Sequence, residues 1–170
     1  MLSKEERRQY NQLFWDGFKK EMRRHNTQHR RAINWLKYPT DIKHVYLRLH
    51  CDNTGAYLNF DVQFKDEGIR DIFWEQLTEL KQVMENATED KGRWLRNQTA
   101  KEGFVFDRIQ WVHPEVNYYS QEDWPVIFGF LKERLLAFDL FYQEFKDVLI
   151  LLVDYITFVL CGYVSTRFFC

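Results

Sequence analysis

Four residues near the middle of the chain have the types and spacing of a Mg²⁺-dependent nuclease centre: Asp41, Asp61, Gln63 and Lys65. In such centres carboxylates hold the metal, and a lysine polarises the attacking water or the scissile phosphate. Gln63 occupies the position where such centres have an acidic residue, and its neutral carbonyl would reduce the affinity for Mg²⁺. Asp61, on the same face of the strand, could compensate for this loss. A plainer interpretation is that Asp61 and Gln63 line the solvent side of an alternating strand, and that Asp41 belongs to the turn after Pro39.

A basic surface is the second feature with a chemical use. On the first predicted helix, cationic side chains fall opposite an aromatic stripe that contains Tyr10, Phe14 and Phe18, and two more follow the helix. These residues are Arg8, Lys19, Lys20, Arg23, Arg24, Arg30 and Arg31. Such a face can neutralise phosphates and displace their counterions. The alternative is an ordinary solvated helix face, since Glu5 and Asp16 interrupt it.

Stacking platforms and metal ligands give weaker signals. Trp111 and the Tyr118-Tyr119 pair could stack on unpaired bases, although aromatic residues occur in every predicted element and packing explains them equally well. Glu21, His25 and His29 follow i, i+4, i+8 spacing, but no fourth ligand accompanies them, and we predict no metal site. The chain contains no nucleophile elbow, phosphate-binding loop or dinucleotide fingerprint.

The elements that must position these residues follow from a change of hydrophobic period. Apolar residues alternate with polar ones through residues 45–64, and the repeat becomes helical through residues 69–87. Period two followed by period 3.6 predicts a β-hairpin with an amphipathic helix packed on it. We therefore predict an α+β fold with a small, mostly antiparallel sheet, in which three main helices on one side cover a central hairpin. The predicted boundaries are about 44–64 for the hairpin, 4–25, 67–88 and 121–147 for the helices, and 33–36 and 104–112 for further strands.

Capping signals support the three helix starts. Ser3 with Glu6, and Ser120 with Asp123, have the spacing of a capping box. Asp66 can cap the middle helix. The helices should therefore begin near residues 4, 67 and 121.

Composition indicates one cytoplasmic domain. The chain has 170 residues, of which 7 are glycine and 3 are proline, so long loops are not expected. A net charge of −1 excludes a strong overall attraction to nucleic acid or anionic lipid, although residues 1–31 hold nine Lys/Arg against four Asp/Glu. Three cysteines without paired spacing indicate a reducing compartment, and Cys51 is predicted to be buried and unreactive. The N-terminus has no apolar run that would predict a signal peptide.

The last segment differs from the rest of the chain. Residues 148–164 contain one charged side chain, Asp154, among 17 residues. The summed free energy of inserting such a segment into a bilayer is about zero, and the segment is short for a span. We divide the chain into a domain at 1–147 and an apolar tail at 148–170, which extends the last helix or anchors the chain in a membrane.

Several short runs together resemble a known family. They are Phe14-Trp15, Ile33-Asn34-Trp35-Leu36, Val45-Tyr46-Leu47-Arg48, Glu75-Gln76-Leu77-Thr78-Glu79-Leu80-Lys81 and Glu122-Asp123-Trp124-Pro125. Over about residues 10–147 the chain resembles the bacterial and archaeal domain of unknown function 4268. The resemblance implies no activity or cofactor. Members of that family occur alone or beside restriction-endonuclease-like domains, whose helix–three-strand–helix–strand order the predicted elements match.

Three functions remain open on this basis. The first is a non-catalytic binding module with a protein or nucleic-acid partner, which the resemblance links to nucleic-acid transactions or defence. For a nucleic-acid partner, charge reversal at Arg23 and Arg24 should weaken binding. The second is a degenerate or active restriction-like nuclease, which alone would need a cofactor, Mg²⁺. The third is a membrane protein anchored through residues 148–164.

Overall fold

The centre of the molecule is a four-stranded antiparallel sheet with strand order β1-β2-β4-β3. The computed structural model describes residues 3–25 and 32–167, with residues 161–167 as backbone only. The predicted α+β fold is confirmed. The elements are α1 (Lys4–Met22), η1 (Trp35–Lys37), β1 (Val45–Cys51), β2 (Gly55–Val62), α2 (Glu67–Glu79), α3 (Lys81–Thr88), β3 (Arg93–Thr99), β4 (Val105–Pro114), η2 (Gln121–Asp123) and α4 (Trp124–Arg167).

The predicted hairpin is formed by β1 and β2, which pair from Val45 opposite Val62 to Cys51 opposite Ala56. Its turn is held by Asp52, whose Oδ1 accepts hydrogen bonds from the backbone N–H of Thr54 at 2.8 Å and of Gly55 at 3.1 Å. An aspartate that bonds to the backbone two and three residues ahead favours a tight turn. The alternation then directs the apolar set of β2 to one face of the sheet.

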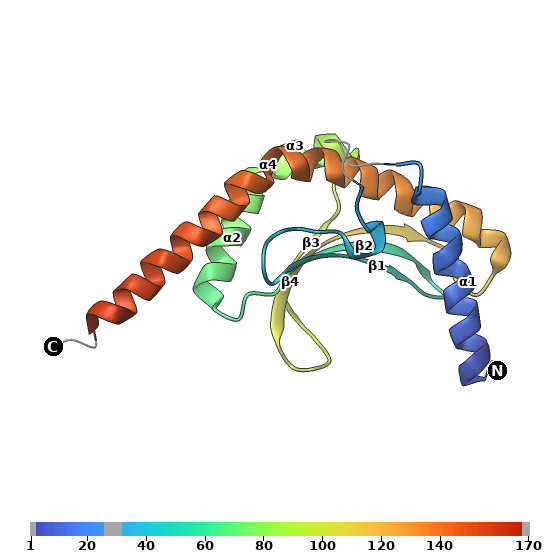
Figure 1. Ribbon diagram of the computed structural model, residues 1–170, viewed down its shortest axis with the longest axis horizontal. Helices are drawn as coiled ribbons and strands as arrows, with labels where there is room; N and C mark the ends of the chain where they lie inside the picture. Colours follow the sequence, from blue (N-terminus) through green and yellow to red (C-terminus); the bar gives the residue numbers. More distant parts are fainter. Residues whose placement is uncertain (1–2, 26–31, 168–170) are drawn as a thin grey trace.

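The helices α2, α3 and α4 lie on the same side of the sheet, α1 lies at one end of it, and none of the described helices covers the opposite face (Figure 1). α4 crosses the sheet and packs its rings on β2 and β4. The centroid of the Phe138 ring lies 5.0 Å from that of Phe60 and 5.9 Å from that of Trp111. Each such side chain contributes about 1.5–3 kcal/mol when it is fully buried, so this contact joins the two layers.

The first helix was predicted to cover the sheet, but α1 packs on α4. Rings of α1 meet rings at the start of α4, with Phe14 5.2 Å from Trp124 and 5.0 Å from Phe128. The predicted capping box is confirmed, because the N–H of Ser3 donates to Glu6 Oε2 at 2.6 Å and the N–H of Glu6 donates to Ser3 Oγ at 3.2 Å. The helix ends at Met22, three residues earlier than predicted.

Two other predicted elements differ from the structure. The strand predicted at 33–36 is wrong, because Asn34 caps a 3₁₀ turn through a 3.1 Å bond from the N–H of Leu36 to its Oδ1. Such a local side-chain bond competes with a strand ladder. The helix predicted at 67–88 is divided at Leu80 into α2 and α3, where the Thr78 hydroxyl donates to the Trp74 carbonyl at 2.9 Å. Back-bonding of this kind bends helices.

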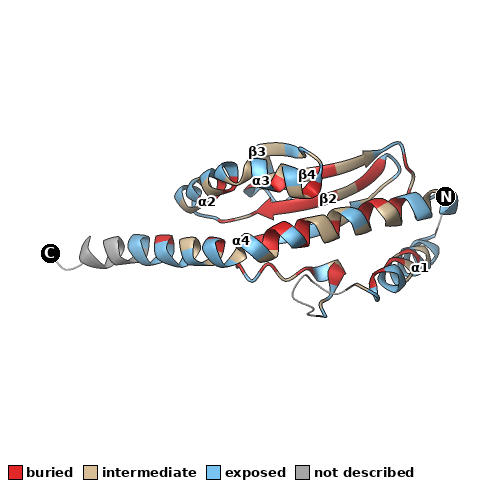
Figure 2. Ribbon diagram, turned by 90° about the horizontal axis from the view of Figure 1, so that it is seen from above, coloured by how far each residue is buried: buried red, intermediate tan, exposed pale blue. Residues whose placement is uncertain are grey.

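The last helix also departs from its predicted limits. Ser120 makes no capping hydrogen bond, and Asp123 instead accepts the N–H of Asn117 at 2.8 Å, so the helix opens with the 3₁₀ turn η2. α4 then continues without a break to Arg167, so residues 148–167 form its last part. Figure 2 shows exposed residues becoming dominant along its second half. Within the described residues, no helix combines the length and the apolar character needed to cross a bilayer.

A buried carboxylate fixes α2 and β3 against β4. Asp107 Oδ1 accepts the N–H of Asn97 at 2.7 Å and lies 3.2 Å from Arg96 Nε, while Oδ2 lies 3.6 Å from Arg70 Nε. Arg70 is itself buried, and its Nη1 donates to the Phe64 carbonyl at 3.2 Å. The ion pair therefore carries charge that has been fully removed from water.

The substitution Asp107→Ala should lower the free energy of unfolding by about 3–5 kcal/mol, because it leaves Arg70 buried without its counter-ion. The matched control is Asp71→Ala, which removes an exposed carboxylate that also pairs with Arg96. That change should cost less than about 1 kcal/mol. Urea unfolding followed by circular dichroism measures both, and equal losses would contradict the assignment.

Candidate nucleic-acid interface

The sheet face opposite the helices carries an excess of arginine. Side chains of a strand alternate between faces, and Leu58, Phe60 and Ile109 belong to the core on the helix side. The intervening positions of β1, β2, β4 and β3 therefore point to the other face, which we call the open face. Its residues are Tyr46, Arg48, His50, Tyr57, Asn59, Asp61, Phe106, Arg108, Gln110, Val112, Arg93, Leu95 and Gln98. Three arginines thus accompany a single carboxylate.

That carboxylate, Asp61, is completely buried beneath two guanidinium groups. Arg108 approaches it with both branches, Nε at 2.6 Å from Oδ1 and Nη2 at 2.9 Å from Oδ2. Arg48 adds a longer contact, with Nη1 at 3.5 Å from Oδ2, and its side chain stays 49% exposed. A bidentate pair satisfies the carboxylate, so Arg48 contributes positive charge that Asp61 does not neutralise.

Aromatic rings lie beside these cations. The guanidinium carbon of Arg48 lies 4.3 Å from the ring centroid of Tyr46, and that of Arg108 lies 4.9 Å from the ring of Phe106. Tyr57 contacts His50 with ring centroids 5.5 Å apart. Mixed cationic and aromatic faces bind single-stranded nucleic acid, because phosphates pair with the cations and bases stack on the rings.

Amide side chains complete the centre of the face. The Nε2 of Gln110 donates to the Oδ1 of Asn59 at 2.9 Å, directly beside the Asp61–Arg108 pair. Asn59 is buried and Gln110 is partly exposed, so only Gln110 retains hydrogen-bonding capacity toward solvent. The open face therefore offers charge, tyrosine rings and one central amide within four adjoining strands.

The family model described as Domain of unknown function (DUF4268) matches residues 10–146. The chain belongs to the DUF4268 family. No curated protein and no solved structure matches it. The match runs from α1 through β4 and ends inside α4, so it includes the whole sheet of this DUF4268 domain and its open face.

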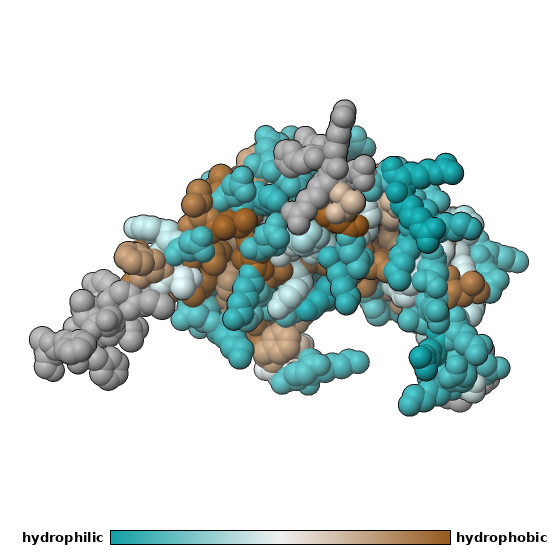
Figure 3. Space-filling model, viewed as in Figure 1, coloured by the Kyte–Doolittle hydropathy of each residue, from teal (hydrophilic) through white to brown (hydrophobic). Residues whose placement is uncertain are grey.

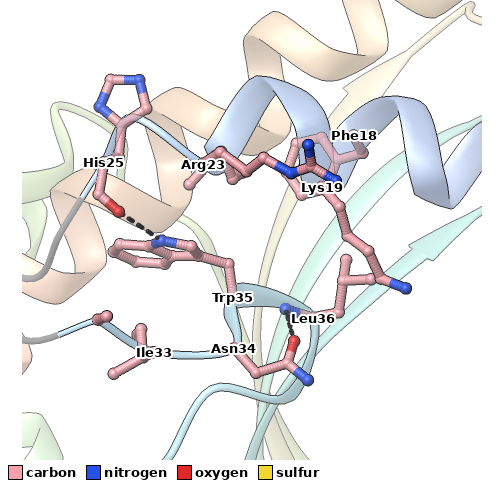
Figure 4. A pocket seen from close by; sticks show the side chains of 10 residues that line it. Phe18, Lys19, Arg23, His25, Ile33, Asn34, Trp35 and Leu36 are labelled. Atoms are coloured by element: carbon pink, nitrogen blue, oxygen red, sulfur yellow. Dashed lines mark hydrogen bonds between the residues drawn. The ribbon is translucent and has the colours of Figure 1, made fainter.

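The predicted basic surface of the DUF4268 domain is divided between separate places. Arg8 lines a hollow at the start of α1, whereas Lys19 and Arg23 border a cavity of about 300 Å³ beside Trp35 at the other end of that helix (Figure 4). Lys20 and Arg24 border a different hollow, which Phe128 of α4 also lines. Arg30 and Arg31 lie outside the described residues. Figure 3 shows a predominantly hydrophilic surface over α1.

The four predicted nuclease residues occupy three different surroundings. Asp41 pairs with Lys146 of α4 at 3.5 Å, and Asp61 is enclosed by arginines on the open face. Gln63 and Lys65 line a cavity of about 660 Å³ next to the start of α2. The strand predicted at 33–36 does not form, so the described elements lack the first of the three strands in the nuclease-like order. The structure gives the nuclease hypothesis no support, and it stays a prediction.

The other candidates from the sequence are the possible metal ligands, the cysteine of β1 and the possible stacking rings. Glu21 accepts a hydrogen bond from Lys132 Nζ at 2.6 Å, which lowers the pKa of its carboxyl. His29 lies outside the described residues, and the described part of the chain contains no group of three side chains arranged to hold a metal. Burial raises the pKa of the Cys51 thiol to about 12, so the thiolate is scarce at neutral pH. Trp111 is buried in the core, whereas Tyr119 is exposed.

Sequence reasoning did not select Arg48, Arg93 and Arg108 as a group. The polar positions of the hairpin were visible, and Arg48 stands among them. The missing information was the pairing of β2 with β4. This pairing places Asp61 opposite Arg108, which lies 47 residues later in the chain. Each of the three arginines lies on a different strand, so they form a group only when the neighbours in the sheet are known.

Removal of Arg108 and removal of Arg48 should have unequal costs. Arg108→Ala should lower the free energy of unfolding by about 3–5 kcal/mol, because it leaves Asp61 buried with only the longer contact to Arg48. Arg48→Ala should cost about 1 kcal/mol or less, because that side chain is half exposed. Chemical unfolding of the two variants compares them directly. A stable Arg108→Ala protein would show that the carboxylate does not need its bidentate partner.

Proposed function

We propose that this DUF4268 domain is a non-catalytic binding module for single-stranded nucleic acid, and that the open face of the sheet is its contact surface. The observation that carries the proposal is the excess of cations on that face, where Arg48, Arg93 and Arg108 accompany one carboxylate, Asp61, which pairs with Arg108 and Arg48. The whole chain has a net charge of −1, so this concentration is local. A cytoplasmic location and a role in nucleic-acid transactions or defence belong to the same proposal.

Rings on the face favour a single strand over a duplex. Unpaired bases can stack on exposed aromatic side chains, whereas the bases of a duplex are already stacked on one another. Tyr46 is 36% exposed beside Arg48, and Tyr57 is partly exposed beside His50. Phosphates of an extended strand would meet the arginines between these rings.

The chemistry of Asp61 argues for binding without catalysis at this face. A carboxylate that holds Mg²⁺ must leave its oxygens available to the metal. Both oxygens of Asp61 accept hydrogen bonds from Arg108, and Arg48 adds positive charge that repels a cation. The arrangement therefore favours an anion above the face and disfavours a divalent cation within it.

The test compares two double variants with the same change in charge. Arg48→Gln/Arg93→Gln alters the open face, and Arg23→Gln/Arg24→Gln alters the basic end of α1. Fluorescence anisotropy with a labelled 20-nucleotide single strand gives the dissociation constant between 50 and 200 mM KCl. The open-face variant should bind more weakly, and its salt dependence should fall by about 1.4 in log–log slope, since each phosphate contact on a single strand contributes about 0.7.

The control variant should bind almost as the wild type does. If Arg23→Gln/Arg24→Gln weakens binding and the open-face variant does not, the binding surface is the basic end of α1. If the wild-type protein binds no single strand even at 50 mM KCl, the proposed function is wrong. Thermal unfolding of both variants confirms that neither loss of binding reflects loss of folding.

A further inference from the structure

A hollow at the start of α1 combines rings with positive charge. Its volume is about 360 Å³, within the range of small-ligand sites. Seven residues line it: Lys4, Arg7, Arg8, Tyr10, Asn11, Tyr118 and Tyr119. Three of these are cations and none is a carboxylate, although the helix also carries Glu5 and Glu6. Glu6 is engaged in the capping box with Ser3.

The floor of the hollow is held rigidly. The Tyr118 hydroxyl donates to Asn11 Oδ1 at 3.0 Å, and the Tyr118 carbonyl accepts from the Tyr10 hydroxyl at 3.1 Å and from Trp124 Nε1 at 2.8 Å. Burial raises the pKa of Tyr118 to about 12 and also raises the pKa of Tyr10, so both rings stay neutral at physiological pH. The floor therefore adds no negative charge to the cations around it.

Tyr119 is presented differently from its neighbour. The residue is 53% exposed, and its ring lies nearly parallel to that of Tyr10, with centroids 6.2 Å apart and an angle of 26° between the planes. The Tyr119 N–H donates to Asn117 Oδ1 at 2.9 Å, which fixes the backbone that carries the ring. A ring supported from one side and exposed on the other is a platform on which a base can stack.

We propose that this hollow binds one nucleoside phosphate unit of a single strand, with the base stacked on Tyr119 and the phosphate held by Lys4 and Arg8. A planar aromatic group and an anion in one ligand match the rings and cations of the lining. Lys4 and Arg8 are four residues apart and so lie on the same side of α1. The start of a helix also attracts negative charge through its dipole.

The hollow is joined to the open face through the turn of the hairpin. The Tyr118 N–H donates to the Asp52 carbonyl at 2.9 Å, and the same turn bonds to the Tyr57 hydroxyl through Thr54 at 2.9 Å. Figure 1 places α1 at the end of the sheet where β1 turns into β2. A single-stranded nucleic acid that crosses Arg48 and His50 is thereby directed to Tyr119. This connection between the two surfaces rests on the proposed function.

The experiment measures binding of a labelled 12-nucleotide single strand, of the duplex of the same sequence, and of adenosine monophosphate alone. Tyr119→Ala should weaken single-strand binding about 5- to 150-fold, the effect of losing one base–aromatic stack. Duplex binding should change less than about twofold, since paired bases do not use the platform. Tyr119→Phe should keep wild-type affinity because the ring remains. The matched control is Tyr155→Ala, which removes another exposed tyrosine, on α4.

Charge is tested separately with Lys4→Gln/Arg8→Gln. Removal of two cations from the first turns of a helix does not weaken its dipole interactions, so folding should be unaffected. Single-strand affinity should fall, with a salt slope lower by about 1.4. Saturation-transfer NMR should show contact between the adenine protons of the monophosphate and the wild-type protein, and the signal should vanish in Tyr119→Ala.

The outcomes separate this site from the proposed function. If Tyr119→Ala binds the single strand as the wild type does while Arg48→Gln/Arg93→Gln is impaired, the hollow is not a binding site and the open face remains one. If adenosine monophosphate binds in a Tyr119-dependent way and no oligonucleotide binds, the hollow takes a free nucleotide and the proposed function is wrong. If neither probe binds, both proposals are overturned.

Discussion

The bidentate pair between Asp61 and Arg108 determines the character of the open face. β2 is a central strand, and its polar side must bury a carboxylate that no helix covers. Burial of that charge is tolerable only with a partner that satisfies both oxygens, and Arg108 supplies it from β4. Because one arginine is sufficient, the positive charges of Arg48 and Arg93 remain in excess. The ion pair therefore stabilises the sheet and leaves it cationic.

A second buried carboxylate acts on the other side of the same two strands. Asp107 is the neighbour of Arg108 on β4 and pairs with Val62 on β2. Because adjacent positions of a strand face opposite sides, the Asp107 side chain points to the helices. There it holds Arg70 of α2 and the irregular part of β3. Neighbouring positions of the β2–β4 ladder thus organise both faces: one orders the helical layer, and the other sets the charge of the uncovered surface. The aromatic contacts of α4 then join these layers.

The fold was more predictable than the site, for a physical reason. Hydrophobic period is local information, and it predicted the hairpin, the helix after Asp66 and the strand that became β4. Two of the failures occurred where a single side chain competes with the pattern, at Asn34 and at Thr78. The site depends on contacts between distant segments. Asp61 had the type and spacing of a metal ligand, and only its position opposite Arg108 shows that it serves an ion pair.

The most direct test of this account is NMR of the arginine side chains during titration with a short single-stranded oligonucleotide. The Nε–Hε signals of Arg48, Arg93 and Arg108 report separately on the open face, and those of Arg23 and Arg24 report on the end of α1. The account predicts that the first three shift progressively and saturate together, while the other two stay in place. Shifts confined to Arg23 and Arg24, or no shift in any of the five, would contradict it.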